Sequence, residues 1–377
     1  MSLHQVSRLM HSQSKVDSAA PWVLQFCHGY DGPFLDCARQ YAVLFKDTPY
    51  KVCTVYLTGE PSAEVVAGSA SDEVLFFNFS SKQVRGLKLA AIKQFKQLVA
   101  SRNFAFCIAH RFKPIYIALL GSKLPVIGVH HAFGDYQRRS RQLMANIFHR
   151  RLRLLGVSNA VRDDMRNCLP KFAESEIQTL YNRIDVAAVQ AEQISRADAR
   201  LALQLPVDAY VVGNVGRLHP DKDQATLIKG FAQALPQLPK GSLLAIMGSG
   251  RLEQFLKTLA HELGIASSVR FLGQVPNGRR YFKAFDLFAL SSDHEPFGMV
   301  LLEAMAAGVP VIATNCGGAK EVVENPDYLF ELGDVAGLAQ LLAQRPSAEV
   351  NNLERFTDQA VLAKYSELHN RWIGRGI

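Results

Sequence analysis

Short runs of apolar residues alternate with segments of helical periodicity along most of the chain. Strands that are apolar at successive positions and separated by helices are typical of parallel sheets covered on both faces. Such runs in the first half are Trp22–Phe26, Lys51–Leu57, Val74–Phe77, Phe104–Ala109, Pro125–Val129, Leu154–Val157 and Ile177–Leu180. Those in the second half are Tyr210–Val215, Leu243–Met247, Val269–Phe271, Leu287–Leu290 and Val311–Ala313. The pattern predicts an α/β fold with two doubly wound, Rossmann-like domains that face each other across a cleft.

Helical periodicity fills the stretches between these strands. Predicted helices include Phe34–Phe45, Ser81–Ser101, Arg138–Leu152, Ala160–Cys168 and a final helix over Asp358–Trp372. The stretch Asp185–Ser195 is polar, and Ser195 followed by Asp198 resembles a capping box that opens a helix. We therefore predict one domain over residues 1–190 and a second over 191–377, with the last helix (about 358–377) packing back on the first domain.

Composition excludes a disordered chain, because 48% of the 377 residues are hydrophobic and 20% are charged. The net charge of +8 fits nucleic acid, an anionic membrane or phosphorylated substrates equally well. Six scattered cysteines without a CxxC pair are typical of buried thiols in a reducing compartment. Residues 1–22 contain no apolar signal region and no run is long enough to span a bilayer, so we expect a cytoplasmic protein.

The stretch Ser291–Gly318 is the richest in chemistry. Pro296 and Gly298 predict a turn between a buried strand and a helix, which places Glu295 in the loop and Glu303 about one turn into the helix. The free N–H groups and positive dipole of a helix start suit a phosphate or a sugar hydroxyl. Two carboxylates in one cleft can accept hydrogen bonds from vicinal hydroxyls. Taken alone, Glu303 also fits an ordinary helix-surface residue.

The order E-P-F-G-x-x-x-x-E within this stretch resembles the E-x7-E signature of retaining glycosyltransferases with the GT-B fold, family 4 in the usual classification. Matching motifs run from residue 29 to residue 318. The resemblance implies transfer of a sugar from a nucleotide-diphosphate sugar, with UDP or GDP as the nucleotide, to an acceptor hydroxyl with retention at the anomeric carbon. It makes the first domain the acceptor side and the second the nucleotide-sugar side.

The resemblance also assigns roles to individual residues. Arg217 and Lys222 match a G-R-x-x-x-x-K element that holds the donor diphosphate, and their fork and point charge suit phosphate oxygens. Glu303 would hold the ribose and Glu295 the hydroxyls of the donor sugar. With His130, which would steady that sugar, Arg217, Lys222 and Glu295 form the predicted catalytic set. Further donor-site candidates are Gly29, Gly32, Gln274, Val275, Phe297, Gly298, Met299 and Val300.

One of these assignments, and two further features of the sequence, have plain structural alternatives. His130 also fits a histidine satisfied in the core, and His131 beside it is less favoured by the strand alignment. His110 ends another strand and fits either the acceptor side or structural packing. The glycines of Gly248–Arg251 resemble a family loop, but close backbone packing explains them equally well.

We expect neither a metal nor a cofactor. Asp221 and Asp223 spell DxD, but Lys222 between them opposes a divalent cation. Asp293, His294 and Glu295 could ligate a metal, yet no second cluster accompanies them. Enzymes of the resembling family neutralise the leaving diphosphate with basic side chains and helix ends.

The segment Tyr136–Ser158 contains six arginines and no acid (Arg138, Arg139, Arg141, Arg150, Arg151 and Arg153). Such a basic amphipathic segment predicts docking to anionic lipid or to a phosphorylated acceptor, or else a solvated helix whose apolar stripe packs on the sheet. Nucleic acid is disfavoured, because aromatic residues are not interleaved with the arginines. With the expected compartment, this favours a lipid-linked glycan acceptor, as in lipopolysaccharide core or cell-surface polysaccharide synthesis, and peripheral contact with the inner face of the plasma membrane.

Other functions share the predicted architecture. A GT-B phosphorylase or epimerase and a non-catalytic two-domain sugar-binding protein stay open as alternatives. A dinucleotide oxidoreductase is disfavoured, because no G-x-G-x-x-G follows the first strand of either half.

Overall fold

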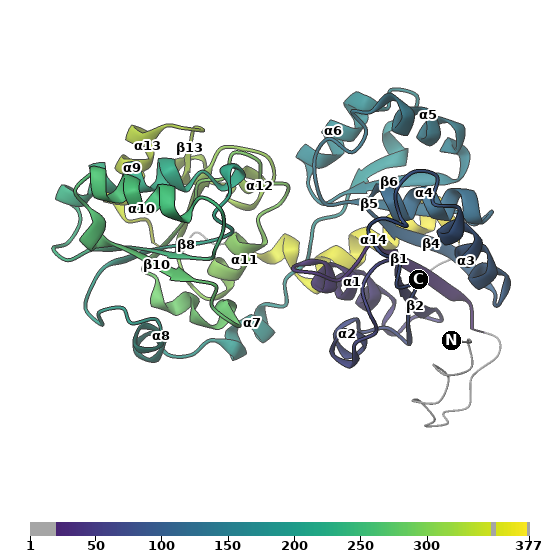
Figure 1. Cartoon of the computed structure of the whole chain (residues 1–377), viewed down its shortest axis with the longest axis horizontal. Helices are drawn as coiled ribbons and strands as arrows, with labels where there is room; N and C mark the ends of the chain where they lie inside the picture. Colours follow the sequence, from purple (N-terminus) through teal and green to yellow (C-terminus); the bar gives the residue numbers. More distant parts are fainter. Residues whose placement is uncertain (1–19, 348–351, 375–377) are drawn as a thin grey trace. The chain divides into compact units, whose positions relative to one another are not determined.

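The computed structural model describes residues 20–347 and 352–374 and contains two sheets flanked by helices (Figure 1). The chain forms two compact units. One runs to Ile108 and includes Ile117–Val126, and the other comprises Ala109–Tyr116 and the chain from Ile127 onward. The strands of the first sheet precede residue 180 and those of the second follow residue 210. The domain boundary near residue 190 stays a prediction.

The first sheet has the order β3-β2-β1-β4-β5-β6-β7. Its strands are β1 (Trp22–Cys27), β2 (Lys51–Tyr56), β3 (Glu73–Phe76), β4 (Phe104–His110), β5 (Val126–His130), β6 (Leu152–Gly156) and β7 (Ile177–Thr179). β2 pairs in parallel with β1 and with β3. Because helices cover both faces of such a sheet, its strands are buried at successive positions, as in β1 and β2.

The second sheet has the order β10-β9-β8-β11-β12-β13. Its strands are β8 (Val211–Val215), β9 (Leu243–Met247), β10 (Val269–Gly273), β11 (Leu287–Leu290), β12 (Val311–Thr314) and β13 (Leu329–Phe330). The helices α9 (Gln224–Ala234), α10 (Glu253–Glu262) and α13 (Val335–Gln344) lie on one side of this sheet, and α7 (Val186–Glu192) and α8 (Arg196–Ala202) on the other (Figure 1). Gly230 lets α9 approach α13, since a Cβ there would lie 2.7 Å from Leu338.

The sequence predicted twelve of these strands and missed β13, whose two residues are too few for a pattern. The predicted helix Ser81–Ser101 is wrong over its first eight residues. The structure has a turn there, and α3 (Leu89–Ala100) begins only after Gly86 and Lys88, which both have positive φ. The predicted helix Arg138–Leu152 is likewise too long. α5 (Arg139–Ile147) is followed by a 3₁₀ turn (His149–Arg151), and Leu152 opens β6.

Other helices begin close to their predicted residues. α1 (Phe34–Ala42) continues as a 3₁₀ turn to Phe45, and α6 spans Asn159–Cys168. The remaining helices of the first half are α2 (Ala63–Gly68) and α4 (Phe112–Gly121). Ser195 caps α8 through a hydrogen bond that Asp198 N donates to its Oγ at 3.1 Å, which confirms the predicted helix start.

The final helix α14 (Asp358–Ile373) contacts residues that precede the predicted boundary. Trp372 Nε1 donates to the Ser175 carbonyl at 2.9 Å, and Arg183 forms an ion pair with Asp358. The predicted extension to residue 377 and the predicted lack of a signal region in residues 1–19 lie outside the described residues. Within the described residues, no helix is both long and apolar enough to cross a membrane.

Arg200 of α8 is a fully buried cation that contacts the chain just before β8 and β11 of the second sheet. Its guanidinium donates to the carbonyls of Ala284, Pro206, Val207 and Ala209 and forms an ion pair with Asp286 at 2.7 Å. Arg196, with half of its side chain exposed, pairs with the same carboxylate at 2.7 Å.

We expect Arg200→Ala to lower the free energy of unfolding by about 3–5 kcal/mol, because it leaves buried carbonyls without a donor. The matched variant Arg196→Ala should cost at most about 1 kcal/mol, since water replaces an exposed pair. Urea unfolding of both variants measures the difference. Equal losses would show that burial of Arg200 contributes nothing.

Candidate functional site

Three loops meet at the carboxyl edge of the second sheet, after β8, β9 and β10. Gly216 N donates to the Met247 carbonyl at 2.9 Å, and Gly248 N donates to the Gly273 carbonyl at 2.7 Å. Gly248 has φ +141°, and a Cβ there would lie 1.9 Å from the Gly216 oxygen. A Cβ on Gly250 would lie 2.4 Å from the Leu218 oxygen. Close backbone packing therefore requires both glycines.

Lys222 and Glu295 come together from two of the predicted motifs. Lys222 ends the 3₁₀ helix η5 (Pro220–Lys222), and its Nζ donates to Glu295 Oε2 at 2.7 Å. Ser292 Oγ donates to the same oxygen at 3.2 Å. Ser291 Oγ donates to the Lys222 carbonyl at 2.9 Å. The loops after β8 and β11 are thus joined by a mostly buried ion pair and a hydroxyl network.

Arg217 lies near this pair in sequence but is held much more loosely. Its side chain is 73% exposed, and its closest carboxylate oxygen, on Asp221, is 3.5 Å away. An exposed pair at that distance contributes little to stability. The guanidinium can therefore turn toward an anionic ligand without a large loss.

The turn that follows Glu295 depends on glycine. Gly298 has φ +100° and precedes α11 (Met299–Ala306), which no side chain caps. Gly318 N donates to the Glu295 carbonyl at 2.7 Å, and a Cβ on Gly317 would lie 2.2 Å from that oxygen. Of the predicted residues here, Phe297 is buried, while Met299, Val300 and Glu303 in the first turns of α11 are half-buried.

The other predicted donor-site glycines lie at the carboxyl end of β1, in the first unit. A Cβ on Gly29 would lie 2.9 Å from Thr58 Oγ1, and Gly32 has φ +58°. Gln274 and Val275 follow β10, with Gln274 exposed and Val275 half-buried. The donor-site assignments of Gly29, Gly32, Gln274 and Val275 stay predictions.

His130 ends β5 and has no exposed surface. Its Nδ1 lies 2.7 Å from Asp135 Oδ2, and the Tyr136 hydroxyl lies 3.2 Å from its Nε2. Burial raises the pKa of Asp135, but the His130 hydrogen bond and the nearby Arg141 charge outweigh it and hold that pKa below its usual range. With both ring nitrogens engaged by protein groups, the geometry favours the core alternative. The sugar contact of His130 stays a prediction.

His131, the less favoured neighbour, stacks on His110 of β4. The ring centroids are 5.4 Å apart at an angle of 15°, and His131 Nε2 lies 3.1 Å from His110 Nδ1. His131 Nδ1 is buried and has no hydrogen-bond partner among the described residues. Burial and the charges of His130 and Arg111 lower the pKa of His131 to about 3. Burial and the charge of His131 lower the pKa of His110. His131 is thus a further candidate for a polar contact with a ligand. Its only sequence signal was its place beside His130.

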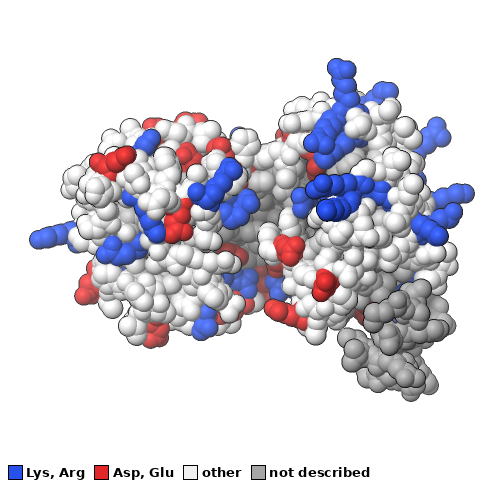
Figure 2. Space-filling model, viewed as in Figure 1, with Lys and Arg blue, Asp and Glu red and all other residues white. Residues whose placement is uncertain are grey.

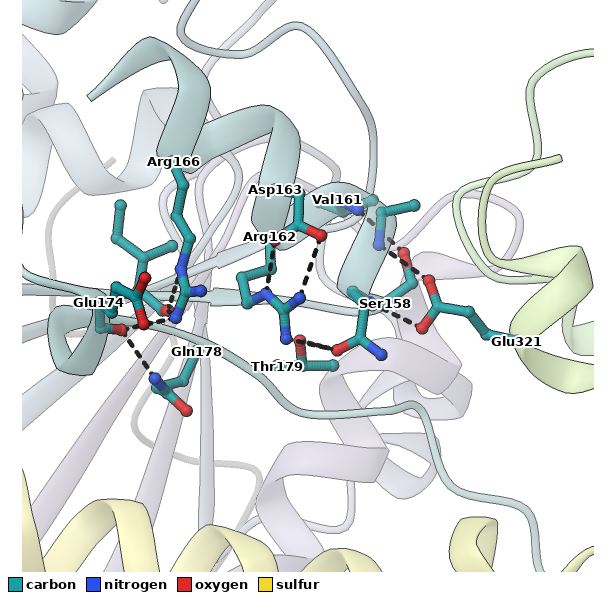
Figure 3. Close-up of polar contacts among 12 residues, drawn as sticks. Ser158, Val161, Arg162, Asp163, Arg166, Glu174, Gln178, Thr179 and Glu321 are labelled. Carbon is teal, nitrogen blue, oxygen red and sulfur yellow. Dashed lines mark hydrogen bonds and ion pairs between the residues drawn. The ribbon is translucent and has the colours of Figure 1, made fainter. Parts of the chain in front are cut away.

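A second polar cluster, for which the sequence carries no signal, lies at the start of α6 (Figure 3). Glu321 of α12 (Ala319–Val322) accepts hydrogen bonds from Asn159 N and Ala160 N, both at 2.8 Å. The Tyr181 hydroxyl donates to Glu321 Oε2 at 3.0 Å, and burial and the Glu321 charge raise the pKa of Tyr181 to about 12. The protein's own carboxylate therefore occupies the positive end of this helix.

A cavity of about 260 Å³ lies beside this cluster. Its lining includes three cations, Arg162, Arg355 and Lys364. Each is paired with a carboxylate, respectively Asp163 at 2.8 Å, Glu324 at 2.6 Å and Glu367 at 2.8 Å. The pairing leaves this cavity without an unmatched charge for an anion.

Metal-ligating side chains do not gather within residues 20–347 and 352–374, where no group of three or more His, Cys, Asp and Glu is placed to hold an ion. Of the predicted DxD residues, Asp221 pairs with His219 and Arg217, and Asp223 caps α9 by accepting from Thr226 N.

Residues 195–360 match the family described as glycosyl transferases group 1. Over 147 residues the chain is 36% identical to the lipopolysaccharide core biosynthesis glycosyltransferase LpsE of Rhizobium meliloti (strain 1021), an alignment that covers 38% of this chain and 42% of the relative. Over 318 residues it is 24% identical to N-acetyl-alpha-D-glucosaminyl L-malate synthase of Bacillus anthracis, covering 79% and 82%. The chain thus spans less than half the length of LpsE but most of the more distant relative.

Among solved structures, the chain is similar to Anabaena HepE in complex with UDP-glucose, with a TM-score of 0.73 and 20% identity over 93% of this chain and 99% of that one. The two parallel sheets and this likeness confirm the predicted two-domain, Rossmann-like GT-B fold.

We expect Glu321→Ala to lower the free energy of unfolding by about 1–3 kcal/mol, because two N–H groups at the start of α6 lose a charged acceptor. Glu321→Gln, which keeps one acceptor oxygen, should lose less. Glu367→Ala, at an exposed pair, is the matched control and should stay within about 0.5 kcal/mol of the parent. Urea unfolding that ranks Glu367→Ala with Glu321→Ala would contradict the proposed capping role.

The low pKa values of His110 and His131 predict a loss of stability in acid. The unfolded chain takes up protons at these histidines below about pH 6.5, whereas the folded protein does not until near pH 3 for His131. Each histidine should therefore lower the free energy of unfolding by about 1 kcal/mol between pH 7.5 and pH 5.5.

Urea unfolding at several pH values tests this slope. The double variant His110→Gln/His131→Gln should show a flatter dependence on pH than the parent, whatever its stability at pH 7.5. His261→Asn, on the exposed side of α10, should keep the parental slope. An unchanged slope in the double variant would refute the assignment.

Proposed function

We propose that the protein is a glycosyltransferase that moves a sugar from a nucleotide-diphosphate sugar to a hydroxyl of a glycan acceptor, with retention at the anomeric carbon. The observation that carries the proposal is the Lys222–Glu295 pair at the carboxyl edge of the second sheet. The pair joins the two motifs that resemble a diphosphate site and an E-x7-E signature. The match of residues 195–360 to glycosyl transferases group 1 supports it.

Charge stabilisation on the leaving diphosphate is the main task of such a site. Lys222 is already held at the loop after β8, and the exposed Arg217 can turn toward the same phosphates. The uncapped start of α11 adds backbone N–H groups and a positive dipole end. These groups can neutralise the diphosphate without a metal ion, and we propose that the reaction needs neither a metal nor a cofactor.

In this proposal, the carboxylates of Glu295 and Glu303 bind hydroxyl groups of the donor. Glu295 binds the donor sugar while its carboxylate is oriented by Lys222 and Ser292, and Glu303 in α11 holds the ribose. We propose a uridine or guanosine diphosphate as the carrier, and the UDP-glucose bound by HepE favours uridine. The acceptor hydroxyl attacks from the front face, and the leaving phosphate takes its proton.

The acceptor is proposed to be a lipid-linked glycan, with the protein at the inner face of the plasma membrane. The name of the relative LpsE, a lipopolysaccharide core enzyme, supports this class. So does α5 (Arg139–Ile147), in which Met144 and Ala145 are buried while Leu143 and Ile147 are 62% and 63% exposed among arginines. This helix therefore has an inner apolar stripe that packs and an outer apolar pair that could meet lipid.

Replacement of Lys222 tests the proposed site. Lys222→Ala should lower kcat/KM for transfer by about 10²–10³, because a charge aimed at the leaving diphosphate is lost. Thermal stabilisation by UDP or GDP should shrink in the same variant, since a ligand at 100 times its Kd adds about 2.7 kcal/mol to the parent. Lys257→Ala, at an exposed lysine of α10 paired with Glu253, is the matched control and should keep full activity.

Two outcomes would overturn the proposal. One is that no nucleoside diphosphate stabilises the parent protein, which would favour a sugar-binding protein. The other is sugar-phosphate formation that depends on free phosphate, which would indicate a phosphorylase.

A further inference from the structure

The chain segregates its charges far more strongly than its net charge of +8 indicates. Residues 74–134 contain nine Lys and Arg and not one Asp or Glu. Figure 2 shows Lys and Arg side chains on both parts of the molecule, with several close together on the part that contains the first sheet. A single-signed stretch of this length attracts an anionic partner.

Within this stretch, the turn after β3 and the first half of α3 present apolar side chains to solvent. We call residues 81–96 the basic loop–helix. Val84, Ala91 and Phe95 are buried and fix it to the first unit. Leu87 and Leu89 point away from that core and are 68% and 69% exposed.

The backbone of the turn is held in place locally. Ser80 N and Oγ both donate to Gln83 Oε1, at 2.8 and 2.9 Å. Lys88 adopts a left-handed conformation at the start of α3, with its Nζ donating to the Gly86 carbonyl at 2.6 Å. The two exposed leucines therefore belong to a formed turn.

Cations flank the exposed leucines in the sequence. Lys82, Arg85, Lys93 and Lys96 are all exposed. Leu89, Lys93 and Lys96 are spaced by four and three residues, so they share one face of α3. An exposed apolar pair flanked in the sequence by exposed cations, with no acid nearby in the sequence, is the chemistry of an interfacial lipid contact.

We propose that the basic loop–helix docks on an anionic lipid bilayer, with Leu87 and Leu89 inserted at the level of the acyl chains and the four cations on the headgroups. A soluble polyanion offers no apolar phase into which the two leucines could insert. The exposed leucines therefore favour a bilayer over such a partner. No aromatic side chain of residues 81–96 is exposed for stacking on nucleic acid bases, since Phe95 is buried.

The position of this surface gives it a use in the reaction. The turn follows the carboxyl end of β3, and Phe79 N donates to the Leu57 carbonyl just past β2. Because the strands are parallel, Gly29 and Gly32 after β1 lie at the same edge of the sheet. The proposal rests on the proposed function in one respect: a bilayer held at this edge would present a lipid-linked acceptor to the acceptor side.

Co-sedimentation of the full chain with vesicles tests the proposal. Vesicles of phosphatidylglycerol and phosphatidylcholine in equal parts should bind the parent protein, and phosphatidylcholine alone should not. Leu87→Ser/Leu89→Ser should lower the partition coefficient at least roughly tenfold, because two buried apolar side chains are lost. Lys93→Gln/Lys96→Gln should also lower it roughly tenfold at low salt and weaken its salt dependence.

The matched control is Leu201→Ser/Leu332→Ser. These leucines are 77% and 52% exposed, but Leu332 lies between Glu331 and Asp334, and neither belongs to the basic stretch. This variant should bind vesicles like the parent. Equal melting temperatures of all variants would show that the fold is intact, as expected for exposed positions.

Vesicle binding that Leu87→Ser/Leu89→Ser leaves unchanged would overturn the proposal, above all if Leu143→Ser/Ile147→Ser in α5 abolished it. Equal binding of the parent to neutral vesicles, or a preference for single-stranded oligonucleotide, would overturn it too. Sugar transfer to a detergent-solubilised acceptor separates this proposal from the proposed function. It should be intact in Leu87→Ser/Leu89→Ser, and its absence in the parent would refute the transferase while leaving the docking result valid.

Discussion

The ion pair between Lys222 and Glu295 is the interaction on which the candidate site depends. It joins the loops after β8 and β11, which are neighbouring strands, and both side chains are largely buried. Such a pair must be compensated by further hydrogen bonds, because desolvation of two charges is costly. Ser292 supplies one of them. A diphosphate beside Lys222 and sugar hydroxyls beside Glu295 would supply more, so the pair is suited to a ligand that brings both anions and hydroxyl groups.

The second constraint is steric, and it explains the glycines at the same edge of the sheet. Gly248 and Gly250 let the loop after β9 contact the backbone at Gly216 and Leu218, and Gly317 does the same beneath Glu295. A methyl group at any of these positions would overlap a carbonyl oxygen. The loops therefore pack on one another through backbone atoms. Within residues 216–222, Arg217 and Lys222 supply the positively charged side chains that could bind a phosphate. Glycine motifs that resemble phosphate loops are here explained first by packing.

The sequence predicted what depends on local pattern and missed what depends on distant partners. The apolar runs identified twelve strands, because burial on both faces leaves a continuous signal. The predicted helix ends were wrong where backbone conformation overrides periodicity, as at Gly86 and Lys88, whose positive φ angles precede α3. The sequence alone could not decide between the two roles of His130, because it does not show that Asp135 and Tyr136 are hydrogen-bond partners of the two ring nitrogens. Glu321 had no signal at all, since the N–H groups that it caps at Asn159 and Ala160 are about 160 residues away in the sequence.

Charge distribution, and not net charge, decides how such a molecule meets an anionic surface. Residues 74–162 hold 16 of the 42 Lys and Arg but only one of the 34 Asp and Glu, so the rest of the chain is net negative. An anionic bilayer would therefore attract residues 74–162 and repel the rest of the chain. Charge alone would hold the protein at the level of the headgroups, and salt would screen the attraction that orients it. Exposed apolar side chains within the basic region, Leu87 and Leu89 in one segment and Leu143 and Ile147 in another, add a short-range attraction that salt does not screen. In the proposed docking, long-range attraction thus comes from the Lys and Arg residues, and short-range insertion comes from apolar side chains of the same segments.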